Sequence, residues 1–349
     1  MTKSFDINSL VRANIAKLKA YSSARDEYSA SCNDMVFLDA NENPFNNGVN
    51  RYPDPYQRKV KELLAEQKGC SVNQMLLGNG SDEALDLIFR AFCEPGKDTV
   101  ITLPPTYGMY KVLADLNEIE NREVLLTKDF EPNVEEILRI ADAHSKLLFI
   151  CSPNNPTGNS FKAEKIRALL TNFSGLVVID EAYIDFTSNH SWISEMQNFP
   201  NLIVTQTMSK AYALAGIRLG ICYASEDVIT ILNKIKPPYN VNELTQKRAL
   251  DQLQNLNLVE RQVNIILAER EALIEALQTL SFVDTIYPTD ANFILIKVDN
   301  ATQRYNELLE KGIVIRNRTT QPLCENTLRI TIGTKEENNI LLTALKQLT

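Results

Sequence analysis

Short apolar runs alternate with amphipathic segments through the middle of the chain, and this alternation restricts the possible folds most. Six runs rich in leucine or β-branched residues have the length of strands: TVITLPP (99–105), REVLLT (122–127), KLLFICSP (146–153), GLVVIDEAY (175–183), NLIVTQTMS (201–209) and RLGICYA (218–224). Helical patterns lie between several of them, as at 134–144 and 163–173. Strands that are apolar along their whole length are usually covered on both faces. The alternation therefore predicts an α/β domain with a mostly parallel central sheet flanked by helices.

The pattern changes after KPPYN (236–240). A long helical stretch over 241–280 is followed by shorter strand and helix patterns, which are typical of an α+β module. We expect a large domain over 45–241 and a small α+β domain over 242–349. The N-terminal segment, 1–44, is expected to join the small domain as a lid.

Composition excludes several classes of protein. The 349 residues carry a net charge of −8 without a dense basic tract, which argues against a nucleic-acid surface. No apolar run is long enough to span a membrane, and the N-terminus lacks the apolar core of a signal peptide. Six scattered cysteines without a CxxC pair indicate reduced thiols, so we expect a cytoplasmic protein. With only two histidines, no metal site is predicted, and acid–base chemistry falls to lysine, tyrosine or carboxylates.

The segment TMSKAYALAGIRLG (207–220) places one amine among small and apolar residues. Taken alone, Lys210 reads more readily as a surface lysine beside a core turn. It follows an apolar strand directly, however, and open α/β sheets bind their ligands at the carboxyl ends of strands. A desolvated lysine there can form a Schiff base with an aldehyde. Arg218 can grip a dianion, and the hydroxyls of Thr207 and Ser209 can add hydrogen bonds. Together these residues indicate a phosphorylated aldehyde, pyridoxal phosphate.

Pyridoxal phosphate makes further demands that the sequence can meet. Its ring nitrogen needs a carboxylate, and Asp180 stands at the end of an apolar strand, where a helix or turn cap is the simpler reading. The hydroxyl of Tyr183 can reach the same ring. The phosphate needs backbone amides, and GNGSDE (78–83) combines glycines with a helix start at Ser81 or Asp82. Simple helix capping explains that motif equally well.

Two proline turns complete the set. CSPNNPTGN (151–159) follows a strand and presents the amide of Asn155, whereas LPPTYGMY (103–110) presents Tyr107 for stacking on a planar ring.

The order GNGSDE, PPTYGMY, SPNNPTGN, DEAYIDF and TMSKAYALAGIRLG resembles the fold-type-I pyridoxal-phosphate aminotransferases over nearly the whole chain. The segments LDANENPF (38–45), RYPDP (51–55), AGIRLGI and LRITIGT (328–334) are similar to the histidinol-phosphate aminotransferase branch. The resemblance implies an aspartate-aminotransferase-like fold and transfer of an amino group from L-histidinol phosphate to 2-oxoglutarate by a ping-pong scheme. Imidazole-acetol phosphate and L-glutamate would be the products, in histidine biosynthesis.

The resemblance also implies roles for the residues. Lys210 would carry the cofactor as a Schiff base and move the substrate proton, Asp180 would pair with the ring nitrogen, and Tyr183 would hold the ring oxygen. The remaining cofactor contacts would come from Gly80, Ser81, Asp82, Tyr107, Asn155, Thr207, Ser209 and Arg218. In a homodimer with active sites at the interface, Tyr52 of RYPDP would reach the neighbouring subunit's cofactor.

Substrate residues are expected in the small domain. Arg329 in LRITIG and Arg316 in IVIRNR lie on or beside strands, where arginines are more often simply solvated. In this branch a guanidinium would bind the phosphate of histidinol phosphate and a carboxylate of glutamate. Tyr21 resembles a lid tyrosine, and Asn292 and Asn240 are further candidates.

Three alternatives stay open. An aromatic amino-acid aminotransferase of the same fold would use the same cofactor residues. A related phosphothreonine decarboxylase is a less favoured alternative. From another class, the chain would be a non-catalytic ligand-binding or regulatory protein of this fold. EPGKD (94–98) lacks the residues of a nucleotide-binding phosphate loop. Retention of both Lys210 and Asp180 argues against a non-catalytic descendant.

Overall fold

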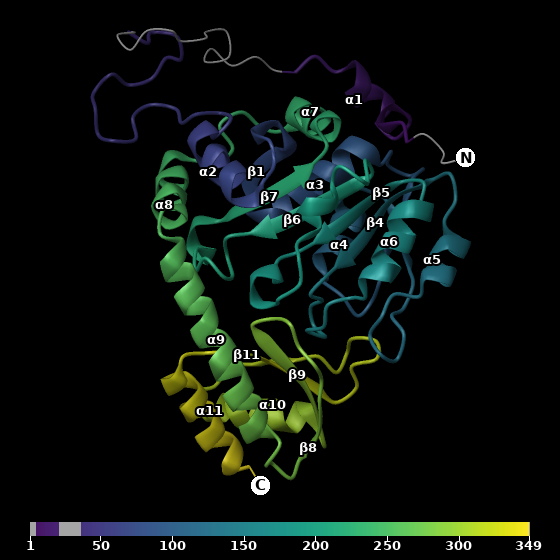
Figure 1. Ribbon diagram of the computed structural model, residues 1–349, viewed down its shortest axis with the longest axis vertical. Helices are drawn as coiled ribbons and strands as arrows, with labels where there is room; N and C mark the ends of the chain where they lie inside the picture. Colours follow the sequence, from purple (N-terminus) through teal and green to yellow (C-terminus); the bar gives the residue numbers. More distant parts are fainter. Residues whose placement is uncertain (1–4, 21–35, 349) are drawn as a thin grey trace.

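The computed structural model describes residues 5–20 and 36–348 and contains two sheets, one above the other (Figure 1). The strands are β1 (Met75–Asn79), β2 (Thr99–Thr102), β3 (Glu120–Glu123), β4 (Ser145–Cys151), β5 (Leu176–Asp180), β6 (Leu202–Thr207), β7 (Leu219–Ala224), β8 (Val283–Ile286), β9 (Phe293–Val298), β10 (Arg316–Asn317) and β11 (Thr327–Thr331). The α-helices are α1 (Ala13–Lys17), α2 (Arg58–Lys68), α3 (Gly80–Phe92), α4 (Met109–Leu116), α5 (Val134–Ile140), α6 (Ala163–Asn172), α7 (Glu226–Ile235), α8 (Glu243–Leu253), α9 (Leu256–Leu277), α10 (Ala301–Glu310) and α11 (Lys335–Lys346).

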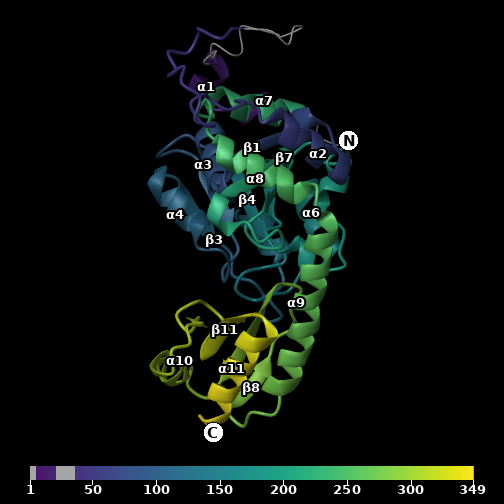
Figure 2. The same ribbon diagram turned by 90° about the vertical axis from the view of Figure 1, so that its left-hand side faces the viewer.

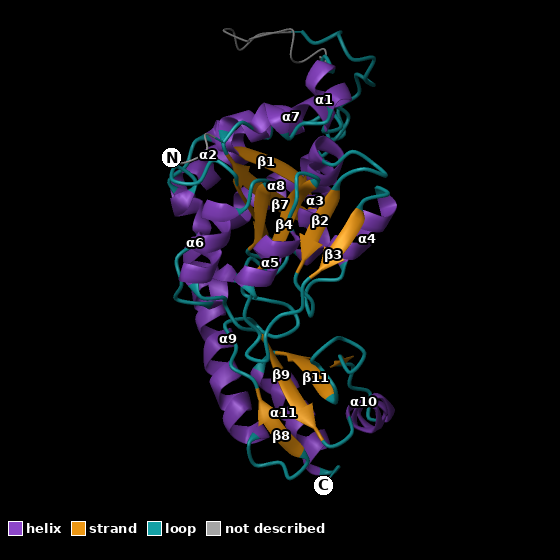
Figure 3. Ribbon diagram, turned by 90° about the vertical axis from the view of Figure 1, so that its right-hand side faces the viewer, coloured by secondary structure: helices purple, strands orange, loops and turns teal. Residues whose placement is uncertain are grey.

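The upper sheet has seven strands in the order β1-β7-β6-β5-β4-β2-β3. The strands β6, β5, β4, β2 and β3 are parallel to one another, whereas β7 runs antiparallel to both β6 and β1. This mostly parallel sheet confirms the predicted α/β class. Parallel pairing brings the carboxyl ends of β4, β5 and β6, which are labelled in Figure 1, to one side of the sheet. Figure 3 shows this sheet above the lower domain.

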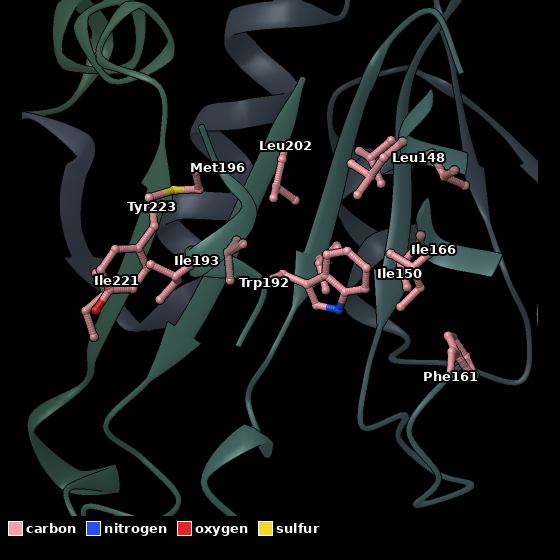
Figure 4. Packing of buried hydrophobic residues seen from close by; sticks show 14 of the residues in the cluster. Leu148, Ile150, Phe161, Ile166, Trp192, Ile193, Met196, Leu202, Ile221 and Tyr223 are labelled. Atoms are coloured by element: carbon pink, nitrogen blue, oxygen red, sulfur yellow. The ribbon is translucent and has the colours of Figure 1, made fainter. Parts of the chain in front are cut away.

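Two buried clusters cover the two faces of this sheet, as the uniformly apolar strands predict. Leu148 and Ile150 of β4 point to one face, where they pack with Ile166 of α6 and with Trp192 (Figure 4). Leu147 and Phe149, which alternate with them along the strand, point to the other face and pack with α3, α4 and α7.

Two strands differ from the prediction. β1 was not expected, because its short run leads directly into the glycine motif at 78–80 and resembles a loop. β3 begins at Glu120 and ends at Glu123, earlier than the expected 122–127, because it is an edge strand whose side chains are largely solvated. An apolar run marks a buried strand better than an edge strand.

The lower sheet has four strands in the order β10-β11-β9-β8, all antiparallel. Its core is closed by α11 and by the last part of α9. The expected helical stretch 241–280 is two helices, interrupted at Gln254 and Asn255. The expected boundary after residue 241 divides the two sheets, yet α8 packs on α2 of the upper domain through Ala249 and Leu253. α9 then runs down the side of the molecule to the lower sheet (Figure 2).

The N-terminal segment corrects the prediction. Its described residues Ile7, Leu10 and Ile15 pack in the core of α3 and α7, far from the small domain they were expected to join (Figure 1). The backbone N–H of Arg12 donates to Ala91 O at 3.0 Å, and its guanidinium pairs with Glu94 at 3.2 Å. The apolar face of α3 is wide enough to accept this segment as well as the sheet. Among the described helices, none combines the length and the apolar character that a bilayer crossing requires.

Candidate active site

Lys210 follows the carboxyl end of β6, at the sheet edge that faces the lower domain. Its Nζ lies 5.5 Å from the centre of the Tyr183 ring. Burial lowers the pKa of this amine below its ordinary value, and the positive charge of Arg329 lowers it further. The pKa shift favours the neutral amine, which is the nucleophilic form.

Asp180 ends the neighbouring strand β5 and is fully enclosed. Its Oδ2 accepts a hydrogen bond from the hydroxyl of Tyr110 at 2.8 Å, and its Oδ1 accepts one from the N–H of Ala182 at 3.1 Å. Burial raises the pKa of this carboxyl to about 6, although the bond from Tyr110 opposes the rise. A buried carboxylate with this environment is ready to receive a positively charged partner.

An anion-binding corner lies at the start of α3. Its N-cap residue, Asn79, makes no side-chain capping bond to the helix, and the positive end of the helix dipole points toward Arg218. The N–H of Gly80 donates to Arg218 O at 2.8 Å, and Arg218 Nη1 donates to Ser209 Oγ at 3.4 Å. Thr207 Oγ1 bonds Ser209 Oγ at 3.0 Å. Hydroxyls, a guanidinium and a helix N-terminus therefore meet at one place.

Two glycines make this corner. Gly80 has a φ of +75°, and a Cβ there would lie 2.8 Å from Arg218 Nη2. Gly220 of β7 lies directly against the α3 start, where a Cβ would collide with the backbone of Gly80 and Ser81. Glycine at both positions lets a strand and a helix N-terminus approach more closely than any side chain permits.

Tyr107 and Asn155 come from the two proline turns. The Tyr107 hydroxyl donates to Asp82 Oδ1 at 3.1 Å, and the ring meets Tyr110 edge-to-face with a centroid separation of 5.5 Å. Asn155 Oδ1 accepts a hydrogen bond from Arg329 Nη1. This last contact ties the upper domain to the lower sheet beside Lys210.

A cavity of about 360 Å³ adjoins Lys210 on the side of the small domain, and we name it the arginine cavity. Its walls include Thr106, Tyr107, Gly108, Met109, Asn155, Pro156, Tyr183, Lys210, Arg316, Arg318, Gln321 and Arg329. Arg316 of β10 lies directly opposite Arg329 of β11 in the sheet, so their side chains share one face. Arg329 also lies over the ring of Phe293, 5.2 Å from its centre. The volume is that of a small-ligand site.

Most of the sequence-predicted residues lie together. One cavity beside the arginine cavity is lined by Ser81, Asp82, Tyr107, Asn155, Asp180, Tyr183, Thr207, Ser209, Lys210 and Arg218. Gly80 lies next to it through its contact with Arg218.

Three predicted residues lie elsewhere in the described chain. Tyr52 stacks on Tyr239 with a centroid separation of 4.5 Å and is 52% exposed. Asn292 contributes its backbone oxygen to Ile332 N at 3.0 Å and lines neither cavity. Asn240 donates to Leu77 O and to Glu83, which is a structural role. Tyr21 lies outside the described residues.

Sequence reasoning missed two residues at the site. Tyr110 of α4 meets the ring of Tyr107 edge-to-face and bonds Asp180, but the second tyrosine of PTYGMY carries no sign of that contact in the sequence. Arg318 lies two residues after Arg316, and residues at that spacing share a face in an extended chain. The second arginine of IRNR was the available signal.

The donor set fits pyridoxal phosphate. One cavity is surrounded by the anion-binding corner, by an amine whose pKa is lowered, by a buried carboxylate and by an aromatic ring. These groups match the phosphate, the aldehyde, the basic nitrogen and the flat face of that cofactor.

Comparison with known proteins agrees with this geometry. A family model described as aminotransferase class I and II matches residues 34–345. Histidinol-phosphate aminotransferases from Flavobacterium johnsoniae and Christiangramia forsetii are 63% and 64% identical, each over 99% of both chains. The crystal structure of the histidinol-phosphate aminotransferase from Clostridium acetobutylicum superposes with a TM-score of 0.80 at 25% identity, covering 86% of this chain and 91% of that one. Since the family model spans most of the sequence and the relatives match it almost end to end, the chain belongs to the class I and II aminotransferases.

Proposed function

We propose that the protein transfers the amino group of L-histidinol phosphate to 2-oxoglutarate, giving imidazole-acetol phosphate and L-glutamate in histidine biosynthesis. The observation that carries this proposal is the position of Lys210. This residue lines both the arginine cavity and the neighbouring cavity that contains Asp180, Ser209 and Arg218. An amine at that junction can reach a reacting carbon while guanidinium groups hold the anion of the same substrate. Three relatives above 60% identity, all named for this activity, support the choice of substrate.

The cofactor is pyridoxal phosphate, which when bound withdraws electrons from the substrate carbon. Asp180 would hold a proton on the ring nitrogen, because an enclosed carboxylate favours a positive partner. Ser81, Thr207, Ser209 and Arg218 would hold the phosphate at the α3 start. Tyr107 would lie against the ring, while Tyr183 and Asn155 would contact the ring oxygen.

Lys210 would anchor the cofactor and move the substrate proton. Its pKa is lowered by burial and by Arg329, which favours the neutral form that can accept a proton. Arg329 would bind the substrate anion next to it. Donation from Arg329 to Asn155 fixes the guanidinium relative to the upper domain.

The protein would act as a cytoplasmic homodimer. Large apolar side chains are exposed beside Tyr52: Val49 is 50% and Leu244 is 65% accessible, and both line one pocket with Tyr52. Isolated exposed apolar residues are ordinary, but a contiguous group beside a pocket is typical of an interface. Residues 40–42, 49–53 and 242–244 line such a pocket together. A second copy on this face would bring Tyr52 toward the partner's cofactor.

The visible spectrum of the purified protein tests this function. Addition of histidinol phosphate is expected to replace the absorbance of the cofactor aldehyde by that of its amine form, and 2-oxoglutarate should restore it. Phenylalanine is the comparison, because it is the substrate class of an aromatic aminotransferase. A large preference in kcat/KM for phenylalanine would refute the choice of substrate, while absence of any spectral change with both compounds would refute amino transfer.

A further inference from the structure

Arg318 follows β10, and its position is fixed by backbone hydrogen bonds. Its N–H donates to Thr327 O at 2.9 Å and its carbonyl accepts from Gln321 N at 2.8 Å. The side chain is half-buried and lines the arginine cavity. Its Nε is enclosed without an acceptor among the described residues. The fixed backbone therefore presents an incompletely bonded guanidinium to the cavity.

The charge of Arg318 has no counter-charge in the described part of the chain. Arg304, by contrast, pairs with Asp299 at 2.7 Å and with Glu307 at 3.1 Å. Burial and the neighbouring charges of Arg329 and Arg316 lower the pKa of Arg318 to about 10, so it stays protonated near neutral pH. Three positive groups on one face repel one another and favour an anion of high charge.

The arginines lie at different depths relative to Lys210. Arg329 donates to Asn155 Oδ1, and Asn155 lines both the arginine cavity and the neighbouring cavity around Asp180. Among the described residues, Arg318 lines the arginine cavity and makes no bond of that kind to a residue that the two cavities share. The charge of Arg329 also acts on Lys210 more strongly than any other charged group does. Arg329 is therefore the inner guanidinium, and Arg318 belongs to the outer part of the cavity.

The two amino compounds of the proposed function, histidinol phosphate and glutamate, differ in how far their anion lies from the reacting carbon. In glutamate the α-carboxylate, of one negative charge, is attached directly to the carbon that bears the amine, and the γ-carboxylate lies on the other substituent, which corresponds to the imidazole arm of histidinol phosphate. In histidinol phosphate a methylene and an oxygen separate that carbon from a phosphate of up to two negative charges. The phosphate therefore extends farther from Lys210 than the α-carboxylate does.

We propose that Arg318 is a specificity-determining residue, which binds the outer side of the substrate phosphate and is not needed for the carboxylate of glutamate. This inference rests on the proposed function. Arg329 binds the anion of both histidinol phosphate and glutamate. Arg318 adds N–H groups that only the more distant and more highly charged phosphate reaches.

The test compares the two half-reactions in the holoenzyme. Rates of the cofactor spectral change are measured against the concentration of histidinol phosphate and, separately, of glutamate. The variants are Arg318→Gln, Arg318→Lys and, as a matched loss of charge on the exposed face of α5, Arg139→Gln. Arg318→Gln is expected to raise the half-saturating concentration of histidinol phosphate by about 10- to 100-fold, the effect of one charge-assisted contact. The half-saturating concentration of glutamate should change by less than about 3-fold in the same variant. Arg318→Lys should restore part of the loss.

Calorimetric titration of the holoenzyme with inorganic phosphate gives a second readout that needs no turnover. Phosphate binding should weaken in Arg318→Gln and stay unchanged in Arg139→Gln. An equal loss for both donors, or unchanged binding of phosphate and histidinol phosphate, would overturn the assignment of Arg318. If the wild type does not react with histidinol phosphate, the proposed function fails instead, and the phosphate titration alone then decides whether Arg318 binds phosphate.

Discussion

Asp180 shows how one side chain depends on a neighbour that the sequence motif does not reveal. The carboxyl is enclosed, and burial alone would favour its neutral form, which is useless for a positively charged ring nitrogen. Tyr110, itself fully buried, donates to it at 2.8 Å and favours the ionised form. The ring of Tyr110 stacks on Phe149, with a centroid separation of 4.9 Å, which fixes the direction of the hydroxyl.

Cofactor binding by the apoprotein should therefore depend on pH through Asp180. The pKa of this carboxyl is raised to about 6, so the carboxylate is present above that pH and is lost as the pH falls through it. Affinity for pyridoxal phosphate should fall below about pH 6 in the wild type. In Tyr110→Phe the fall should begin about one to two pH units higher, the equivalent of a charge-assisted hydrogen bond. Fluorescence titration of the apoprotein between pH 5 and 8 measures this, and coincident curves would contradict it.

Lys210 carries a prediction of a different kind. Lys210→Ala should lower kcat by about 10³-fold or more, because the loss of a positioned proton-transfer group removes 10²–10⁴-fold and the anchor is lost with it. Lys128→Ala, an exposed change of the same type, is the control. Steady-state kinetics with histidinol phosphate and 2-oxoglutarate measure both, and turnover of Lys210→Ala near the wild-type rate would refute the role given to the amine.

At the scale of elements, the start of α3 depends on its approach to β7. Gly220→Ala would place a Cβ against the backbone of Gly80 and Ser81, so the strand or the helix must move. We expect a loss of about 1–3 kcal/mol in unfolding free energy, the usual range for overpacking, and weaker cofactor retention. Gly216→Ala is the matched control, because a Cβ there meets nothing within 4 Å. Urea denaturation measures the unfolding free energy of both variants. Equal values would contradict the prediction, because they would show that β7 moves away from α3 without a loss of stability.

Sequence patterns identify the strands that are buried and miss the strands and side chains that depend on contacts with distant parts of the chain. The apolar runs that form β4, β5 and β6 are buried along their whole length except at Lys146, and burial is what an apolar run indicates. The edge strand β3 and the short β1 lack that signal. Likewise, motifs that follow strand ends located Lys210 and Asp180. Tyr110 and Arg318 are significant only through contacts that cross the fold.

At the scale of the molecule, the site lies where the two sheets meet. Asn155 of the upper domain accepts a bond from Arg329 of the lower sheet, and Gly158 O accepts one from Asp290 N at 2.8 Å. A Cβ at Gly158 would lie 2.5 Å from Thr289 Oγ1, so this junction is also closely packed. The proposed cofactor contacts would therefore come from one domain and the proposed substrate cations from the other. Any relative movement of the sheets changes the distance between Lys210 and the arginines.

The exposed position of Tyr52 leads to a prediction about assembly. Glu42 holds the Tyr52 turn by accepting from Tyr52 N at 2.6 Å and from Arg51 at 2.7 Å, yet the Tyr52 ring lines neither cavity of its own subunit. If Tyr52 serves a partner, the chain should sediment at twice its 39.4 kDa, and Leu244→Glu should shift it toward the monomer.

Mixing two inactive variants tests the crossing of Tyr52 directly. In a heterodimer of Lys210→Ala with Tyr52→Ala, one site combines an intact Lys210 with an intact Tyr52 from the other chain, and the second site lacks both. Random reassortment after mild denaturation and refolding should therefore restore about a quarter of the wild-type activity, since half of the dimers are mixed and each has one complete site. Each variant refolded alone provides the baseline. If the mixture shows only the mean of the two parents, Tyr52 acts within its own subunit or not at all.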